Sequence, residues 1–173
     1  MKRLLQLRWT YLYLLLVPLV NWSFAAVPTV PMPDGGEWPP MAIVTGLVLV
    51  FRDFTQREIG HYVFIPLLIG VYLSYEMAGA EIALASGLAF LVSETVDWAV
   101  YTFTKKPLSA RIMLSSLIGA PIDSAVFLLG ASLVVSGIFT PFTIATSIAS
   151  KLLGAYIVYR IIKHREQRGL VTA

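Results

Sequence analysis

Apolar stretches of about 20 residues follow one another along most of the chain, and they restrict its fold more than any other feature. A helix of about 20 apolar residues, each adding about 1.5 Å, crosses the hydrocarbon core of a bilayer. The windows that qualify are residues 9–27, 41–60, 62–78, 81–103, 111–136 and 139–160. The sequence therefore predicts an all-α integral membrane protein, in which a bundle of six transmembrane helices forms a single transmembrane domain over residues 1–173.

The composition agrees with this fold class. Charged residues make up 13% of the chain and hydrophobic residues 57%, whereas soluble domains carry about 25% charged residues. The chain has no cysteine, which excludes disulfides, thiolate metal sites and cysteine nucleophiles. The net charge of +3 does not indicate nucleic-acid binding, because the distribution of the basic residues fits a membrane instead.

The lysines and arginines gather on one side of the predicted membrane. With six spans, 12 of the 13 basic residues fall at or near the termini and the two loops of that side, and Lys151 lies inside a span. The opposite loops contain acids only, namely Asp34, Glu37, Glu76 and Glu81. The positive-inside rule then places both termini in the cytoplasm, so we expect a multi-pass protein of the cell (inner or plasma) membrane.

The first window allows a second interpretation. Lys2 and Arg3, an apolar core over residues 11–20 and the pair Ala25-Ala26 resemble a secretory signal peptide. The apolar stretch is long, however, and Pro18 interrupts it, which favours a retained first helix. Cleavage would leave five spans and the rest of the arrangement unchanged.

Ionisable side chains lie in the middle of these windows, where a charge costs several kcal/mol unless it faces a protein interior or a water-filled path. Counted from the non-cytoplasmic ends of their windows, Arg52 and Asp53 lie roughly 17 Å deep and Glu94 roughly 20 Å, and Lys151 lies roughly 15 Å from Pro141. Asp123 lies about 18 Å from the cytoplasmic end of its window. In a core about 30 Å thick, these depths predict a polar site for a solute near the midplane.

Helical spacing assigns some of these residues to faces. Glu94, Asp97, Trp98 and Tyr101 are related by i+3, i+4 and i+7, which places two carboxylates and two aromatic rings on one stripe. In the next window, Pro121 removes a backbone donor close to an acid. Transporters often present backbone groups of broken helices near the midplane, so we expect the fifth helix to be broken near Pro121.

Purely structural roles compete with a binding site at several positions. Asp53 and Arg57 are one helical turn apart and could form an ion pair that only fixes the helix. Lys151 could likewise be a structural partner of Glu94 or Asp123 on other helices. The groups expected to be ordinary interfacial residues at the cytoplasmic boundary are Arg57, Glu58 and His61.

Motifs of several enzyme classes are missing. The chain has no phosphate-binding Gly-x-x-x-x-Gly-Lys-Ser/Thr loop. Its two histidines, His61 and His164, are far apart, and no cluster has the spacing of metal ligands or of a serine hydrolase triad. We therefore expect no enzyme, no metal and no cofactor.

Three segments resemble the queuosine precursor transporter family, also called the vitamin uptake transporter (VUT) family. They are FRDFTQREIG at residues 51–60, SETVDW at residues 93–98 and GAPIDS at residues 119–124. The resemblance covers the second to sixth windows in order. It implies a six-helix bundle that imports a 7-deazaguanine precursor of queuosine, such as 7-cyano-7-deazaguanine.

A guanine-like edge presents two neighbouring donors, which one carboxylate can accept together. We expect Glu94 and Asp123 to contact such a substrate, Asp97 to tune them or share a proton, and Trp98 or Tyr101 to stack on its ring. Five acids against three bases near the midplane favour protonation of one carboxyl group, which would allow proton-coupled uptake. The full set of expected substrate-binding residues is Glu94, Asp123, Asp97, Arg52, Asp53, Gln56, Trp98, Tyr101 and Lys151.

Two other functions remain open from the sequence. The chain could be the substrate-binding membrane subunit of a modular vitamin or nucleobase importer that needs separate energising proteins, because it contains no ATPase motif. It could also be a non-transporting membrane scaffold whose buried charges only pair helices. The oligomeric state, including a homo-oligomer, and the coupling ion are left open as well.

Overall fold

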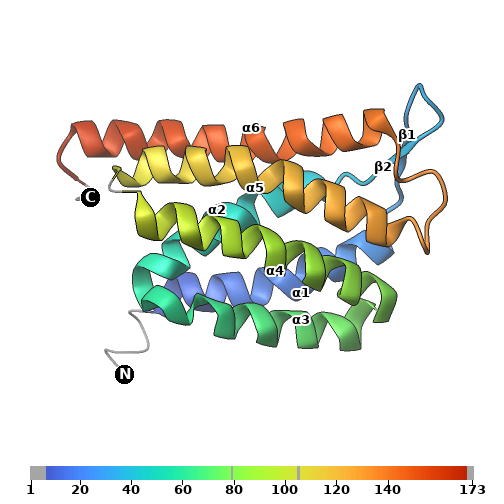
Figure 1. Cartoon of the computed structure of the whole chain (residues 1–173), viewed down its shortest axis with the longest axis horizontal. Helices are drawn as coiled ribbons and strands as arrows, with labels where there is room; N and C mark the ends of the chain where they lie inside the picture. The colour runs from blue at the N-terminus through green and yellow to red at the C-terminus, as the bar shows by residue number, and fades with distance from the viewer. Residues whose placement is uncertain (1–6, 79, 105, 171–173) are drawn as a thin grey trace.

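Long helices running along a common axis make up most of the protein (Figure 1). The computed structural model describes residues 7–78, 80–104 and 106–170. Its α-helices are α1 (Arg8–Ala26), α2 (Ala42–Ile59), α3 (Phe64–Ala78), α4 (Ala80–Phe103), α5 (Leu108–Ala131) and α6 (Pro141–Gln167). The beginning of α1 and the end of α6 lie at the same end of the bundle (Figure 1).

Five helical stretches of the described residues are long and apolar enough to cross a membrane. They are Arg8–Ala26, Ala42–Met77, Ala80–Phe103, Leu108–Ala131 and Pro141–Gln167. The second stretch contains both α2 and α3, because the short 3-10 helix η2 (Gly60–Val63) joins them directly. Gly60 reverses the chain there with a φ of 61°, a conformation that costs other residues more.

The helices form a closed ring in which each packs against two neighbours. The order around the ring is α1, α2, α6, α5, α4 and α3. Chain order is therefore not spatial order, since α1 lies between α2 and α3 and α2 meets α6. Side chains on the inner faces of α2, α4, α5 and α6 consequently point towards a shared interior.

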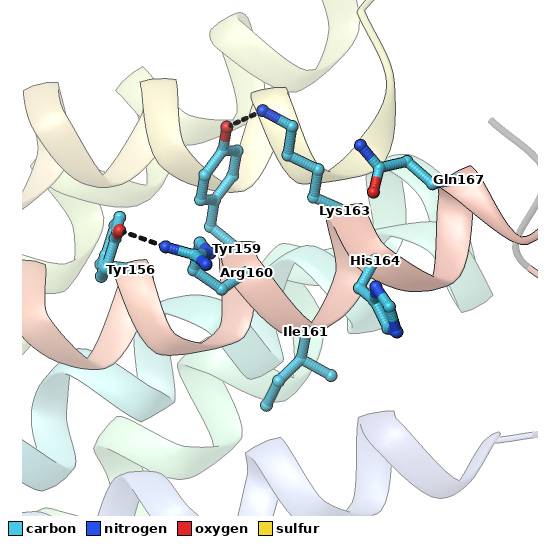
Figure 2. Close-up of a pocket in the computed structure, with 7 residues that line it drawn as sticks. All are labelled: Tyr156, Tyr159, Arg160, Ile161, Lys163, His164 and Gln167. Carbon is cyan, nitrogen blue, oxygen red and sulfur yellow. Dashed lines mark hydrogen bonds between the residues drawn. The ribbon is translucent and has the colours of Figure 1, made fainter.

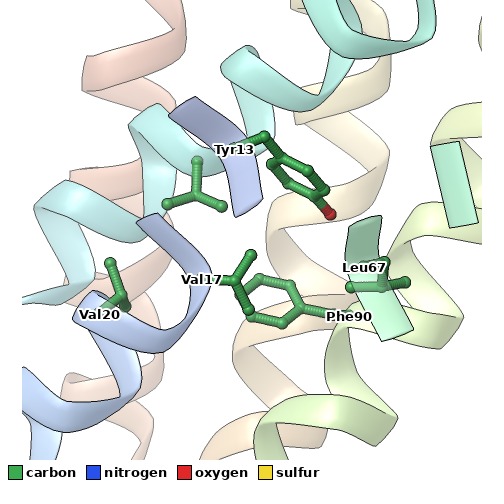
Figure 3. Close-up of a cluster of buried hydrophobic side chains, with 6 residues drawn as sticks. Tyr13, Val17, Val20, Leu67 and Phe90 are labelled. Carbon is green, nitrogen blue, oxygen red and sulfur yellow. The ribbon is translucent and has the colours of Figure 1, made fainter. Parts of the chain in front are cut away.

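Apolar packing fills one part of this interior. Tyr13, Val17, Val20, Leu67 and Phe90 are buried together between α1, α3 and α4 (Figure 3). A Cβ at Gly70 would lie 2.9 Å from Cβ of Val17, so glycine lets α3 approach α1 closely. In a membrane, such side chains stabilise the bundle by close van der Waals packing rather than by removal from water.

The expected break in the fifth helix is wrong. Helix α5 continues from Leu108 to Ala131 with Pro121 inside it. A proline removes a single backbone hydrogen bond, and the packing of neighbouring helices can tolerate this loss in a membrane helix. Helix α5 is packed along α4 on one side and α6 on the other. It also ends at Ala131, before the expected residue 136, and turns connect it to α6.

The proline-rich loop between α1 and α2 carries a short hairpin. Strand β1 (Val30–Pro31) pairs antiparallel with β2 (Glu37–Trp38). At its tip, Asp34 accepts a hydrogen bond from the backbone N–H of Phe142, at 3.2 Å, at the start of α6. Slight desolvation pushes the pKa of the exposed Asp34 up, but hydrogen bonds from Thr140 and from backbone N–H groups outweigh it and lower that pKa from its ordinary value of 3.8.

Carboxylates from distant helices also cap two helices at the other end of the bundle. Glu58 at the end of α2 accepts hydrogen bonds from the backbone N–H groups of Trp9 and Thr10, at 3.1 and 2.9 Å. Glu166 in the last turn of α6 accepts one from the N–H of Ser109, at 3.0 Å. A negative group at a helix N-terminus satisfies free N–H donors and the helix dipole. Glu58 therefore has a specific partner rather than a purely interfacial position.

Candidate functional site

Charged side chains from four helices are buried inside the ring. Each has at most 3% of its surface exposed: Arg52 and Asp53 on α2, Glu94 and Asp97 on α4, Asp123 on α5 and Lys151 on α6. In the low dielectric of a helix bundle, each such charge needs a partner of opposite sign or a proton. We call these six residues the buried charge cluster.

Arg52 is the centre of the first part of this cluster. Its Nε donates to Oε2 of Glu94 at 2.5 Å, and its Nη2 donates to the main-chain oxygen of Glu94 at 3.1 Å. Its Nη1 donates to Oδ1 of Asp53 at 3.1 Å and to Oε1 of Gln56. The guanidinium thus binds α2 to α4 through charge-assisted hydrogen bonds, which are the stronger kind.

Two further residues complete the hydrogen bonds of these acids, and neither was among the expected substrate-binding residues. The hydroxyl of Tyr13 on α1 donates to Oε1 of Glu94 at 2.9 Å. The hydroxyl of Ser115 on α5 donates to Oδ2 of Asp53 at 3.2 Å. Tyr13 shares a helical face with the apolar Val17 and Val20, so the only signal was a tyrosine in the middle of an apolar span.

Lys151 and Asp123 form the second part of the cluster. Nζ of Lys151 donates to Oδ2 of Asp123 at 2.5 Å and to the hydroxyl of Ser124 at 2.8 Å. The pair links α6 to α5, as the structural alternative for Lys151 anticipated. Its position depends on Gly46, because a Cβ there would lie 2.6 Å from Cα of Lys151. Glycine lets α2 and α6 approach at the level of the ion pair.

Asp97 differs from the other acids. It is 1% exposed, yet neither oxygen of its carboxylate has a hydrogen-bond partner among the described residues. A Cβ at Gly119 of α5 would lie 2.8 Å from Oδ1 of Asp97, so the missing side chain of glycine leaves space for the carboxylate. A buried polar group without a partner costs about 1–3 kcal/mol. Such groups in native proteins often have a functional reason.

The charges inside the cluster do not cancel. Asp53, Glu94, Asp97 and Asp123 oppose only Arg52 and Lys151, which leaves a formal charge of −2 if all are ionised. Asp97 is close enough to interact electrostatically with the other three acids. An excess of this kind in low dielectric is relieved by a bound proton or by a ligand that donates hydrogen bonds.

Trp98 and Tyr101 lie outside the hydrogen-bonded cluster. Nε1 of Trp98 donates to Nδ1 of His61 at 2.8 Å, and the guanidinium carbon of Arg111 lies 4.8 Å from the ring centre of Tyr101. A cavity of about 310 Å³ lies at the end of the bundle that holds the end of α2 and the beginning of α5. The residues that line it include Gln56, His61, Tyr101 and Arg111. Gln56 connects this cavity to the cluster, because its side chain accepts from Arg52.

A larger hollow of about 730 Å³ lies on the outer surface of α6 (Figure 2). Arg160 donates to the hydroxyl of Tyr156, and Lys163 donates to that of Tyr159, both at 2.8 Å. All residues that line it come from this one helix. Aromatic and basic residues of this kind are typical of a membrane interface, and the hollow is not part of the buried charge cluster.

Comparison with known families agrees with this geometry. A family model described as "Putative vitamin uptake transporter" matches residues 40–164. The chain belongs to this family. The family match includes the whole buried charge cluster, whereas α1 precedes it. Vitamin uptake transporters are not an enzyme class, and together with the apolar helices this membership indicates a membrane transport protein. Neither the search of curated proteins nor that of solved structures found a match.

Proposed function

We propose that the chain imports a 7-deazaguanine precursor of queuosine, such as 7-cyano-7-deazaguanine, and that the buried charge cluster binds it. The observation that carries this proposal is the buried carboxylate of Asp97, whose oxygens have no partner in the described part of the chain. Membership of the vitamin uptake transporter family supports the transport of a small organic solute. The finer substrate class rests on the resemblance of the three motifs and on hydrogen-bond chemistry.

A guanine-like edge matches this carboxylate. The ring N–H and the exocyclic amine are neighbouring donors, and a carboxylate accepts both in a bidentate arrangement. Sequence reasoning favoured Glu94 and Asp123 for this contact, but both oxygens of Glu94 already accept, from Tyr13 and Arg52, and Oδ2 of Asp123 accepts from Lys151. Asp97 is therefore the better first acceptor, with the two ion pairs as its surroundings.

Proton coupling follows from the excess of acids in the cluster. A proton bound by one of the other acids leaves Asp97 ionised to accept the two N–H groups, so that proton and substrate enter together and are both released inside. The formal charge of −2 in the cluster supports this coupling, because one of the acids is more stable when protonated. The proposal therefore predicts uptake that a proton gradient drives.

The proposed topology has six membrane spans with both termini in the cytoplasm of the cell that carries it. The end of α2, the beginning of α5 and the end of α6 lie at one end of the bundle (Figure 1). That end carries Arg57, Arg111, Arg160 and Lys163, and the loops of the other end carry Asp34 and Glu37. The distribution supports a positive-inside orientation.

The test is uptake of labelled 7-cyano-7-deazaguanine by proteoliposomes that contain only this chain, with an inward proton gradient. Asp97→Asn should lower the initial rate at least about tenfold, because the amide replaces one acceptor by a donor. Glu81→Gln, on the exposed outer turn of the same helix, is the matched control and should transport normally.

Normal uptake by Asp97→Asn would contradict the proposed role of this acid. Binding of the substrate without accumulation in these vesicles would contradict import by the chain alone and favour a subunit that needs energising proteins. A complete lack of binding would contradict the substrate class.

A further inference from the structure

A small cavity lies on the other side of the Lys151–Asp123 pair, towards the acidic end of the bundle. Its volume is about 10 Å³, enough for about one water molecule. The ion pair forms one wall, and the remaining lining includes Asn21, Phe24, Phe90 and Phe127. The cavity therefore combines aromatic rings from three helices with a polar wall.

The orientation of the Asn21 amide is fixed by its neighbours. Nδ2 of Asn21 donates to the hydroxyl oxygen of Ser74 at 2.8 Å. The single hydroxyl hydrogen of Ser74 is already used, since it donates to the main-chain oxygen of Gly70 at 2.7 Å. Ser74 can therefore only accept from Asn21, and a flipped amide would place two acceptors against each other. Oδ1 must be the atom that faces away from Ser74.

This oxygen is an acceptor without a donor. Asn21 is 0% exposed, and its Oδ1 has no hydrogen-bond partner in the described ranges 7–78, 80–104 and 106–170. Asn21 lines the cavity, so a hydrogen-bond donor placed in the cavity can reach the Asn21 side chain. A buried acceptor left without a donor is costly, which makes it a candidate for a ligand N–H group.

The aromatic lining indicates the shape of that ligand. Phe24 and Phe127 have ring centres 4.6 Å apart at an interplanar angle of 43°, and Phe90 is buried beside them. Phenylalanine rings stack on flat rings, and a planar molecule could separate Phe24 from Phe127. A bicyclic ring does not fit in about 10 Å³, so its binding requires these side chains or their helices to move apart.

The cavity is at a different depth from Asp97. Asn21 lies roughly 8 Å from the end of α1, whereas Asp97 lies roughly 26 Å from the start of α4 at the same end of the bundle. A single bicyclic ligand does not reach both positions. The Lys151–Asp123 pair lies between them in depth.

We propose that this cavity is an outer subsite for a planar heterocycle bearing a ring N–H, which donates to Oδ1 of Asn21 while its ring lies among Phe24, Phe90 and Phe127. The proposal deepens and rests on the proposed function, because the subsite lies on the path to Asp97. Asn21 acts as a specificity residue that selects the N–H group before the substrate reaches the charged cluster.

The experiment measures binding of 7-cyano-7-deazaguanine, other planar N–H heterocycles and their ring N-methyl derivatives to the detergent-solubilised full chain. Asn21→Leu keeps a similar volume and removes the acceptor, so it should weaken N–H ligands about tenfold or more. The N-methyl derivatives should bind Asn21→Leu and the unmodified chain equally, because neither complex contains the N–H···O bond. The Tm of Asn21→Leu without ligand should be unchanged or higher.

Ser147→Ala is the matched control. Ser147 is another buried residue whose hydroxyl lacks a partner within the described residues, but it does not line this cavity. Its removal should leave every affinity unchanged. If Asn21→Leu does not fold, Phe127→Leu provides a second variant, and loss of the ring should weaken the same ligands several-fold.

The outcomes separate the two proposals. Equal affinity of 7-cyano-7-deazaguanine for both chains would overturn the subsite and leave the proposed function intact. A different N–H heterocycle could bind the unmodified chain but not Asn21→Leu, while the deazaguanine binds neither chain. That result would support the subsite and overturn the proposed substrate. A lower Tm with unchanged affinity would show that Asn21 is only structural, and absence of any binding to the unmodified chain would overturn both.

Discussion

Lys151 and Asp123 illustrate how each buried base holds two helices together. Their ion pair joins α6 to α5, and the pair of Arg52 and Glu94 joins α2 to α4. Removing two charges from water is costly, and the attraction between them compensates for this cost only while both are present. Loss of one partner therefore has a larger effect than loss of the pair.

Lys151→Met should lower the free energy of unfolding by about 3–5 kcal/mol, because it leaves the carboxylate of Asp123 buried without its base. The double variant Lys151→Met/Asp123→Asn should recover much of this loss. Unfolding of the detergent-solubilised protein by a denaturing detergent measures both values. The single variant Asp123→Asn completes the comparison. If the loss of unfolding free energy in the double variant equalled the sum of the losses in the two single variants, a direct pair would be contradicted.

The sequence located these charges but left their pairing open, since Lys151 could partner either Glu94 or Asp123. Depth counting found Arg52, Glu94, Asp123 and Lys151, since a charge in an apolar window is visible without a structure. Arg52 and Glu94 lie on α2 and α4, which are not consecutive, and Asp123 and Lys151 are 28 residues apart on α5 and α6, so no local spacing reveals either pair. Tyr101 has the same angular position as Glu94 but lies about 10 Å further along the helix, where it meets Arg111.

Close contact of α2 and α6 sets the position of the Lys151 backbone. Gly46 faces Cα and the main-chain oxygen of Lys151, and a Cβ there would lie 2.6 and 2.8 Å from them. Backbone atoms cannot rotate away as a flexible side chain does. Small residues at such crossings allow membrane helices to pack.

Gly46→Ala should push α6 away from α2 and reduce both stability and uptake, with a loss of about 1–3 kcal/mol for overpacking. Gly154→Ala is a control at the same helix pair, because its nearest atom would be 3.7 Å away and ordinary contact results. Thermal unfolding and uptake of the two variants provide the comparison. Equal Tm values and equal uptake rates of Gly46→Ala and Gly154→Ala would show that the close backbone contact at Gly46 limits neither stability nor transport.

The loop that starts α6 should respond to acid. Hydrogen bonds from Thr140 and from backbone N–H groups hold the pKa of Asp34 below 3.8 despite some desolvation. A lowered pKa in the folded state adds stability that is complete above 3.8 and disappears as the pH falls through the folded-state value. Asp34→Asn removes this contribution.

The Tm of the unmodified chain should therefore fall towards that of Asp34→Asn as the pH is lowered from about 6 to about 2. The difference between the two chains is the quantity to measure, since the other acids titrate in both. A constant difference across this range would contradict the role of the Asp34 carboxylate.

The sequence predicted the positions of the helices better than the points at which some of them end. The predicted windows overlap all of the helices from α1 to α6 because apolar composition marks them. The end of α5 was misplaced because residues 132–136 are apolar as well and fold as turns. Pro121 suggested a break, yet tertiary packing on both sides of α5 keeps the helix continuous.

The ring order of the helices places the buried charge cluster inside the molecule and leaves an apolar surface outside. Leu68, Leu84, Leu117 and Leu153 are exposed on the outer surface, which a bilayer would cover. The described acidic and basic ends of the bundle are then separated by the apolar surface. This arrangement makes membrane orientation directly measurable.

The absence of cysteine makes each introduced thiol unique. Glu76→Cys near the acidic end and Gln167→Cys at the end of α6 both replace exposed side chains. In intact cells or spheroplasts, a membrane-impermeant maleimide should label Glu76→Cys at once. It should label Gln167→Cys only after permeabilisation. The reverse pattern would contradict cytoplasmic termini.

The cap of α5 by Glu166 has a consequence for biogenesis. Ser109 lies in the first turn of α5, and the cap of this helix is supplied by the last turn of α6, 57 residues later. A ribosome releases α5 long before it releases Glu166, so the first turn of α5 must wait for α6 to be synthesised and inserted. By contrast, α1 obtains its cap from Glu58 as soon as α2 follows it. The two halves of the ring can therefore be completed at different stages of synthesis, and α6 closes it last.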